Sequence, residues 1–130
     1  WTYYGEDQYS SDDLQTMAFL MKVVKYVKSN AIVVGAGQMT LGVGGGQPNR
    51  VNSAQIALEE MKAKDLETDG KIILASDAFI PMRDTVDLAS QYGVDVIVQP
   101  GGSIHDDDVI AACQEKGIDL VMTGYRHFKH

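Results

Sequence analysis

The stretch "KIILASDAFIPMRDTVDLASQYGVDVIVQPGGSIHDDDVIAACQEKGIDLVMTG", residues 71–124, alternates short apolar runs with helical patterns. It predicts buried strands at 71–76, 94–100 and 118–124 and helices at 84–93 and 103–117. Gly93 closes the first of these helices, and the second has Ser103 as its N-cap and Gly117 as its C-cap. Strands that alternate with helices over short links must run parallel, with crossover helices between them. This stretch therefore predicts an α/β fold.

The preceding part of the chain predicts a helix, a hairpin and a second helix. Ser11 and two aspartates begin a helix with a broad apolar face that ends near Asn30. The run "AIVVGAGQMTLGVG", residues 31–44, has two apolar stretches around a glycine turn, which is typical of a β-hairpin. Apolar spacings of three and four residues from Val51 to Met61 indicate the second helix.

The expected architecture is a single α/β domain that covers residues 1–130. Residues 1–10 have no clear period and are interpreted as a lead-in segment. The order α-β-β-α-β-α-β-α-β then gives a mixed, mostly parallel sheet with helices on both faces. Such a chain is long enough to bury a core without disulfides.

Composition excludes several classes of function. The chain has one cysteine, Cys113, so a disulfide framework and a cysteine-based zinc site are excluded, and a cytoplasmic location fits best. The net charge of −7 argues against a general nucleic-acid binder and against an anionic-membrane binder. No apolar run approaches the roughly 20 residues of a membrane span, and no signal peptide is visible.

Polar and conformationally special residues follow each of the three late strands. They lie in "SDAFIPMRD" (76–84), "QPGGSIHDD" (99–107) and "TGYRHFKH" (123–130). In open α/β sheets, ligands bind beyond the carboxyl ends of the strands. We therefore expect these segments at one edge of the sheet, around a binding site. No H-x-E or C-x-x-C pattern is present, so we expect no zinc site.

The glycine-rich run "GVGGGQPNR", residues 42–50, leaves two interpretations open. It is neither a dinucleotide fingerprint nor a Walker A loop, because Gln47 replaces a required glycine and no Gly-Lys-Ser/Thr follows. A helix start offers free N–H groups to an anion, and Arg50 adds a forked donor there. A flexible link between the hairpin and the second helix explains the glycines equally well.

The late segments also have two interpretations each. Phe79 and Asp84 could form a pocket wall, or they could simply belong to an Asp-rich helix start. The Gly-Gly-Ser turn that ends at Ser103 is rich in N–H groups. The basic tail around Arg126 could receive an anionic substrate, or it could be a solvated end.

Several segments together resemble a known family. "KYVKSNAIVV", "GQPNRV", "SDAFIPMRD", "VIVQPGGSIHDDDVI" and "TGYRHFKH" look like the C-terminal part of the AICAR transformylase region of the bifunctional AICAR transformylase/IMP cyclohydrolase family. The resemblance runs from about Leu14 to His130. It implies a cytidine-deaminase-like three-layer α/β/α fold, which that transformylase uses twice, with this chain as the second copy.

The resemblance also implies a reaction and its residues. The family transfers a formyl group from 10-formyltetrahydrofolate, a co-substrate, to the 5-amino group of AICAR, and no metal is required. The implied catalytic residue is Asn30, which also binds AICAR near the reacting centre. The other implied AICAR-binding residues are Arg50 and Arg126, and we expect Arg126 near the 5′-phosphate. The implied folate-binding residues are Val51, Phe79, Asp84, Ser103 and Ile104.

Departures from the family pattern are few. Pro48, Ile80, Met82 and His105 replace residues that are commoner in the family, and none of them removes a matched contact residue. The family's Lys-His pair, whose histidine accepts the proton, belongs to the preceding half of the transformylase and has no match here. We therefore expect an incomplete site with little activity alone, completed by the missing half and by a homodimer. The alternatives are a stand-alone AICAR- or folate-binding module and a structural dimerisation domain.

Overall fold

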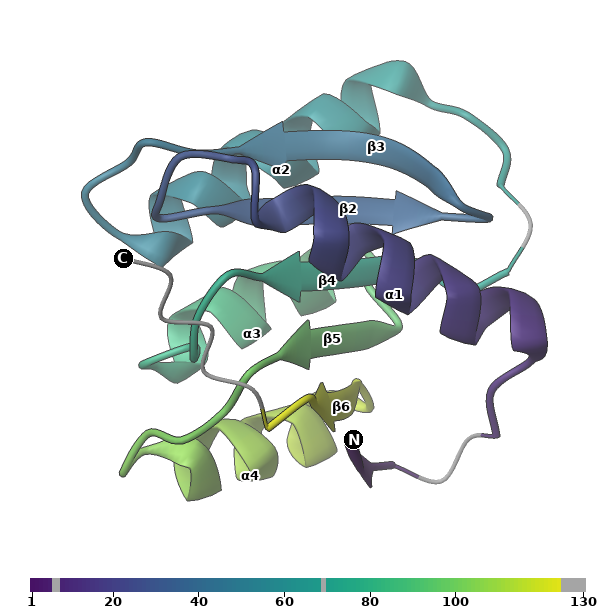
Figure 1. The fold of residues 1–130 in the computed structure, drawn as a ribbon. Coiled ribbons are helices and arrows are strands. Elements are labelled where there is room, and N and C mark those ends of the chain that lie inside the picture. The colour runs from purple at the N-terminus through teal and green to yellow at the C-terminus, as the bar shows by residue number, and fades with distance from the viewer. Residues whose placement is uncertain (6–7, 69, 125–130) are drawn as a thin grey trace.

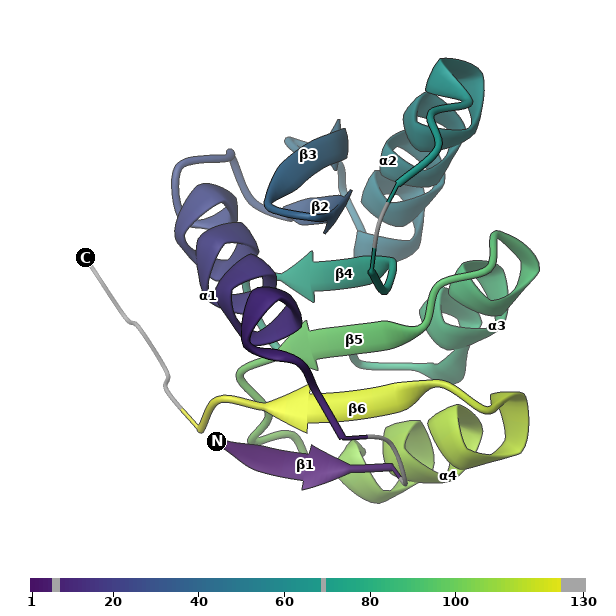
Figure 2. The same cartoon turned by 90° about the vertical axis from the view of Figure 1, so that its right-hand side faces the viewer.

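A computed structural model describes residues 1–5, 8–68 and 70–124, and these form a six-stranded sheet with helices on both faces (Figure 1). The elements in chain order are β1 (Thr2–Tyr4), α1 (Ser11–Val24), β2 (Ile32–Ala36), β3 (Met39–Gly44), α2 (Arg50–Lys64), β4 (Ile73–Ser76), α3 (Arg83–Gln91), β5 (Val96–Gln99), α4 (Asp106–Lys116) and β6 (Asp119–Met122). Helix α1 covers one face, and α2, α3 and α4 cover the other (Figure 2).

The sheet has the order β1-β6-β5-β4-β2-β3. Strands β4, β5 and β6 pair in parallel, and the other three pairings are antiparallel. Because β3 is antiparallel to β2, and β2 to β4, strand β3 also runs in the direction of β4, β5 and β6. The predicted three-layer α/β/α fold with a mixed sheet is confirmed, and "mostly parallel" holds for the direction of the strands rather than for their pairings.

Strand β1 was not expected from the sequence. Residues 2–4 of the lead-in segment pair antiparallel with β6, from Thr2 opposite Met122 to Tyr4 opposite Leu120. Three residues are too few to display an alternating pattern, so the strand is visible only through its partner. It extends the sheet by one edge strand beyond the order expected from the sequence.

Two helix ends also differ from the predictions. Helix α1 ends at Val24, well before Asn30, and i→i+3 hydrogen bonds from Tyr26 and Val27 close its last turn. Helix α4 begins at Asp106 with His105 as its N-cap residue, so the prediction of Ser103 as N-cap was wrong.

The segment before α4 has its own hydrogen bonds. The Ser103 hydroxyl accepts the N–H of His105 at 3.0 Å. The Asp106 carboxylate accepts the N–H groups of Gly102 and Ser103 at 2.8 and 3.1 Å. The Asp106 carboxylate thus orders the loop before α4, whereas no side chain of the described residues caps the helix itself.

Each face of the sheet has its own core. On the face of α1, three helix residues pack on inward side chains of the strands, such as Ala75 and Val98. Those helix residues are Met17, Leu20 and Val24. On the other face, Leu74, Ile97 and Leu120 lie under the remaining helices. Successive strand residues point to opposite faces, so burial on both faces explains why these strands are apolar throughout.

Two glycines of the 42–50 run allow α2 to lie directly on β3. A Cβ atom on Gly42 would overlap the carbonyl oxygen of Ala57, and one on Gly44 would overlap that of Ser53. A larger residue at either position would push the helix away from the sheet. These glycines therefore serve helix packing, a role that neither sequence interpretation included.

The outer side of α1 leaves apolar side chains uncovered. Leu14 and Phe19 are each 36% exposed, and Tyr26, just beyond the helix, is 92% exposed. Part of the broad apolar face predicted for this helix is therefore exposed in the described part of the structure. Among the helices in the described ranges, none combines the length and the apolar character that a membrane crossing requires.

Candidate functional site

The segments that follow β4, β5 and β6 begin at one edge of the sheet. The three strands are parallel neighbours, so their carboxyl ends lie side by side. Hydrogen bonds join the segments there: the N–H of Thr123 donates to the Gln99 carbonyl at 2.9 Å, and that of Gly124 to the Pro100 carbonyl at 3.0 Å. The N–H of Ile80 donates to the Gln99 side chain. The expected clustering at this edge is observed for its described residues.

Asp77, the first residue after β4, is the centre of a hydrogen-bond network. Its Oδ1 accepts the N–H of Ala31 and the Nη2 of Arg50, both at 3.2 Å. Its Oδ2 accepts the Ser29 hydroxyl at 2.7 Å. One carboxylate therefore ties the segment before β2, the end of β4 and the start of α2 together.

The Arg50–Asp77 ion pair is largely shielded from water. The two side chains are only 16% and 13% exposed. An ion pair in such surroundings interacts more strongly than the same pair on an open surface. The network therefore holds the guanidinium group of Arg50 in a defined place at the first turn of α2.

Asn30 joins the same region through its side chain and its backbone. Its Nδ2 donates to the carbonyl of Gln47 at 3.0 Å, and its own carbonyl accepts the hydroxyl of Ser53 at 2.6 Å. Ser53 is fully buried in the first turns of α2. The structure thus brings the predicted residues Asn30 and Arg50 together, although residues 31–49 of the hairpin and loop separate them.

The guanidinium group of Arg50 retains unused donors. One of its five N–H groups contacts Asp77, while the buried Nε has no hydrogen-bond partner within the described parts of the chain. A buried donor without an acceptor is costly. An acceptor supplied by a ligand would remove that cost, which marks Arg50 as a candidate contact for an anionic or carbonyl-bearing molecule.

The predicted folate-side residues form a looser set. Phe79 is 39% exposed and Ile104 is 94% exposed, so both offer apolar surface to a ligand. Asp84 accepts the N–H of Thr85 at 2.9 Å, and Ser103 bonds only within its own loop. Val51 is half-buried beside Arg50. In the described ranges these hydrogen bonds stay local and do not connect the set to the Asn30–Arg50 network.

One predicted site residue lies outside the described residues, and two substituted positions differ in their surroundings. Arg126, with the rest of "YRHFKH", lies outside the described residues. The substituted positions Ile80 and Met82 differ in environment, because Ile80 is fully buried in the core whereas Met82 is 62% exposed. Of the two, the Met82 change therefore alters the exposed surface and the Ile80 change alters the packing beneath it.

Two polar residues of this edge were not singled out in the sequence. Asp77 is the first residue after the buried strand β4, and this position is a usable sequence signal for a site residue. Gln99 ends the apolar run of β5, and a single polar residue at the carboxyl end of such a strand is a usable signal. Both act through partners distant in sequence, which a local pattern does not display.

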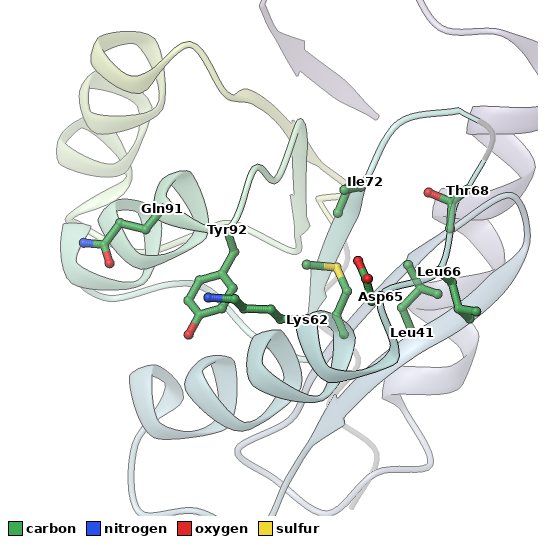
Figure 3. Close-up of a pocket in the computed structure, with 9 residues that line it drawn as sticks. Leu41, Lys62, Asp65, Leu66, Thr68, Ile72, Gln91 and Tyr92 are labelled. Atoms are coloured by element: carbon green, nitrogen blue, oxygen red, sulfur yellow. The ribbon is translucent and has the colours of Figure 1, made fainter.

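A cavity of about 460 Å³ lies at the opposite end of the sheet (Figure 3). It is lined by Leu41, Met61, Lys62, Asp65, Leu66, Thr68, Ile72, Gln91 and Tyr92, where the ends of α2 and α3 meet the start of β4. The Lys62 ammonium lies 5.9 Å from the centre of the Tyr92 ring. None of the predicted site residues that the structure describes lines it, so we place the candidate site at the carboxyl edge, where the shielded polar network lies.

Metal and thiol chemistry find no support in the described ranges. Among those residues, no three His, Cys, Asp or Glu side chains are grouped so that they could hold a metal ion. Cys113 is buried between α4 and the sheet. Burial, together with the nearby charge of Asp119, raises the pKa of its thiol to about 12, so the nucleophilic thiolate is not formed near neutral pH.

Comparison with known proteins relates this chain to bifunctional purine biosynthesis enzymes. The model of the AICARFT/IMPCHase bienzyme family matches residues 1–60. The chain is 51% identical over 125 residues to the bifunctional purine biosynthesis protein PurH of Clostridium botulinum. The aligned region covers 96% of this chain and 24% of that protein. It is 49% identical over all 130 residues to the PurH protein of Ligilactobacillus salivarius, of which it covers 25%. The chain thus spans about a quarter of the length of these relatives.

Two solved structures with a similar fold contain a deaminase. A diaminohydroxyphosphoribosylaminopyrimidine deaminase/5-amino-6-(5-phosphoribosylamino)uracil reductase from Thermotoga maritima superposes with a TM-score of 0.56 at 17% identity, over 83% of this chain and 35% of that one. The dCMP deaminase of cyanophage S-TIM5 superposes with a TM-score of 0.50 at 18% identity, over 85% of this chain and 93% of that one. At such identities the likeness concerns the fold alone.

Proposed function

Because this chain belongs to the AICARFT/IMPCHase bienzyme family, we propose that it forms one part of a formyltransferase site in purine biosynthesis. The reaction is formyl transfer from 10-formyltetrahydrofolate to the 5-amino group of AICAR. In this proposal the chain corresponds to the C-terminal part of the transformylase region. It supplies the folate side of the site and part of the AICAR side.

The arrangement of Arg50 carries the proposal. Its guanidinium is held by Asp77 in a shielded position, and its buried Nε still lacks an acceptor in the described part of the chain. AICAR offers carboxamide and phosphate oxygens, which are good acceptors for such a fork. Arg126 is the second arginine proposed for AICAR, and we assign the 5′-phosphate to it.

Asn30 is the residue proposed nearest to the chemistry. In formyl transfer, the amine nitrogen attacks the formyl carbon and loses a proton, the bond from that carbon to the folate nitrogen breaks, and the folate nitrogen gains a proton as it leaves. The Asn30 backbone is fixed by Ser53, and its side chain donates to the neighbouring loop at Gln47. An amide anchored in this way can orient the amine or the formyl oxygen by hydrogen bonding, because precise placement lowers the barrier.

The folate is proposed to lie along the exposed apolar residues of the same edge. Phe79 and Ile104 offer apolar surface, and Asp84 can accept hydrogen bonds from the N–H groups of a pterin. Val51 and Ser103 complete this set. The set is open to solvent, so a second protein surface is needed to enclose the folate.

The proton acceptor is proposed to come from another part of the protein. The chain has no match to the family's Lys-His pair, and a base must lie within contact distance of the proton it removes. We therefore propose that the 130-residue chain has little or no turnover alone and that the preceding transformylase half completes the site. The uncovered apolar side of α1 suits the homodimer contact that we expect.

The test compares the isolated chain with a chimera. The chimera is a full-length bienzyme of the family that carries this chain in place of its own segment, and formyl transfer is measured in both. The proposal expects turnover in the chimera that falls in its Arg50→Ala and Asn30→Ala variants, and none in the chain alone. Normal turnover of the chain alone would contradict the incomplete site. Tight calorimetric binding of AICAR by the chain alone would favour a stand-alone binding module.

A further inference from the structure

Gln99 is a buried polar residue at the candidate edge that the proposed function has not used. It ends β5, and its side chain is fully buried. Its Oε1 accepts the N–H of Ile80 at 2.5 Å. Its Nε2 is also buried, and it has no hydrogen-bond partner within residues 1–5, 8–68 and 70–124.

Stability alone does not account for a glutamine at this position. A buried amide that uses its oxygen and leaves its nitrogen unpaired is less favourable than a fully paired one, because the lost water contacts are not replaced. The neighbouring residues of β5, Val96, Ile97 and Val98, are all apolar and fully buried. Among these apolar neighbours, Gln99 differs by the hydrogen bond that its side chain accepts from the Ile80 N–H. The role of Gln99 must therefore be sought in that bond.

The bond to Ile80 fixes the loop that presents Phe79. The N–H of Ile80 belongs to the peptide group that links Phe79 to Ile80, and the Ile80 side chain is anchored in the core. At the other end of the loop, the Ser76 hydroxyl donates to the carbonyl of Ala78 at 2.7 Å. The half-exposed ring of Phe79 thus lies between two fixed backbone points.

We propose that Gln99 is a positioning residue for the folate side of the site, which acts by holding the Phe79–Ile80 peptide. This proposal rests on the proposed function and specifies which of the two substrates depends on Gln99. Arg50 and Asn30 are held by Asp77, Gln47 and Ser53, a separate set of hydrogen bonds. Loss of the Gln99–Ile80 bond should therefore affect the folate co-substrate and leave AICAR little changed.

Two variants separate positioning from a general loss of structure. Gln99→Met has a similar volume but no acceptor for the Ile80 N–H, whereas Gln99→Glu keeps an acceptor. In the chimera described above, Gln99→Met should raise the KM for the folate co-substrate about tenfold, the effect of roughly one hydrogen bond, with the KM for AICAR changed less than about twofold. Gln99→Glu should recover part of the loss. Equal increases of both KM values in Gln99→Met, or no recovery in Gln99→Glu, would overturn the proposal.

An NMR measurement on the 130-residue chain keeps the test independent of catalysis. In Gln99→Met, the amide proton of Ile80 should shift upfield and exchange faster, and the amide signal of Phe79 should broaden or move. A matched change at the buried Leu41, Leu41→Met, which lies at the cavity on the opposite end of the sheet, should leave both signals in place. If Gln99→Met leaves them unmoved, the positioning role is wrong even when the chimera is active. If the chimera with the unaltered chain is inactive, the proposed function fails while the NMR result still decides whether Gln99 holds the loop.

Discussion

Arg50 and Asp77 form an ion pair with an Nη2–Oδ1 distance of 3.2 Å, which ties the first turn of α2 to the end of β4. The same carboxylate binds Ser29 and the backbone of Ala31, so it links three parts of the chain that are distant in sequence. The position of the arginine is therefore a tertiary property and does not follow from α2 alone.

Asp77→Asn should weaken AICAR binding by about tenfold, because a charged acceptor holds Arg50 more firmly than a neutral amide does. The KM for AICAR in the chimera measures this effect. Asp65→Asn removes the same charge at an exposed position with a left-handed backbone that asparagine tolerates, and it is the control. An equal change in both variants would show that total charge matters rather than the ion pair.

Arg50→Lys should lower kcat/KM for AICAR by at least about tenfold although the charge is kept, because an ammonium group cannot contact Asp77 and a ligand in the forked geometry of a guanidinium. Steady-state kinetics in the chimera check this expectation. Arg83→Lys is the matched control, since Arg83 pairs with Asp87 and Glu115 on the exposed surface. Unchanged kinetics in Arg50→Lys would mean that only the positive charge is needed.

Gly44→Ala should destabilise the fold by about 3 kcal/mol, because the added methyl group overlaps the Ser53 carbonyl and forces α2 away from β3. Denaturant unfolding of the 130-residue chain measures the loss. Gly93→Asn is the control, because Gly93 has a φ of 77°, which asparagine tolerates, and no atom within 4 Å of the added Cβ. A Gly44→Ala chain as stable as the unaltered one would show that the helix can move at little cost.

Cys113 should make the chain less stable as the pH rises from about 9 to about 12. The folded pKa of about 12 lies above the ordinary value of 9.0, so in this range the unfolded chain loses the thiol proton while the folded chain keeps it. The contribution is fully present below pH 9 and is lost as the pH rises, with a slope of at most about 1.4 kcal/mol per pH unit. Unfolding free energies of the unaltered chain and of Cys113→Ala, compared across this range, isolate the thiol. Parallel pH profiles would show that Cys113 ionises as readily in the folded chain as in the unfolded one.

The central part of the fold was predictable because its pattern is local. The alternation of apolar runs and helical periods in 71–124 corresponds to β4 through β6 with α3 and α4 between them. Strands buried on both faces must be apolar throughout, and crossover helices impose the parallel order, so the sequence carries that information without any knowledge of contacts.

The remaining features depend on partners that are distant in sequence. Strand β1 exists only because β6 offers it an edge, and Gly44 is required because the backbone of Ser53 passes directly over it. The prediction of a Ser103 cap was wrong because α4 begins only at Asp106, and the Ser103 hydroxyl accepts the His105 N–H in the turn before it. For the site, Asn30 came from family resemblance, and Arg50 came from the helix-start pattern together with that resemblance. The residue that holds Arg50, Asp77, required the three-dimensional arrangement.

The pairing of β1 with β6 has a consequence for how the molecule assembles. Thr2 lies opposite Met122, so this ladder closes a loop of almost the whole described chain, and its entropic cost is the largest of any strand pair in the sheet. The hairpin and the crossover units can form first from nearby residues, whereas β1 must wait for a completed β6. With only three residues, it should also be the first strand to detach, which would leave the edge of β6 open to another extended segment.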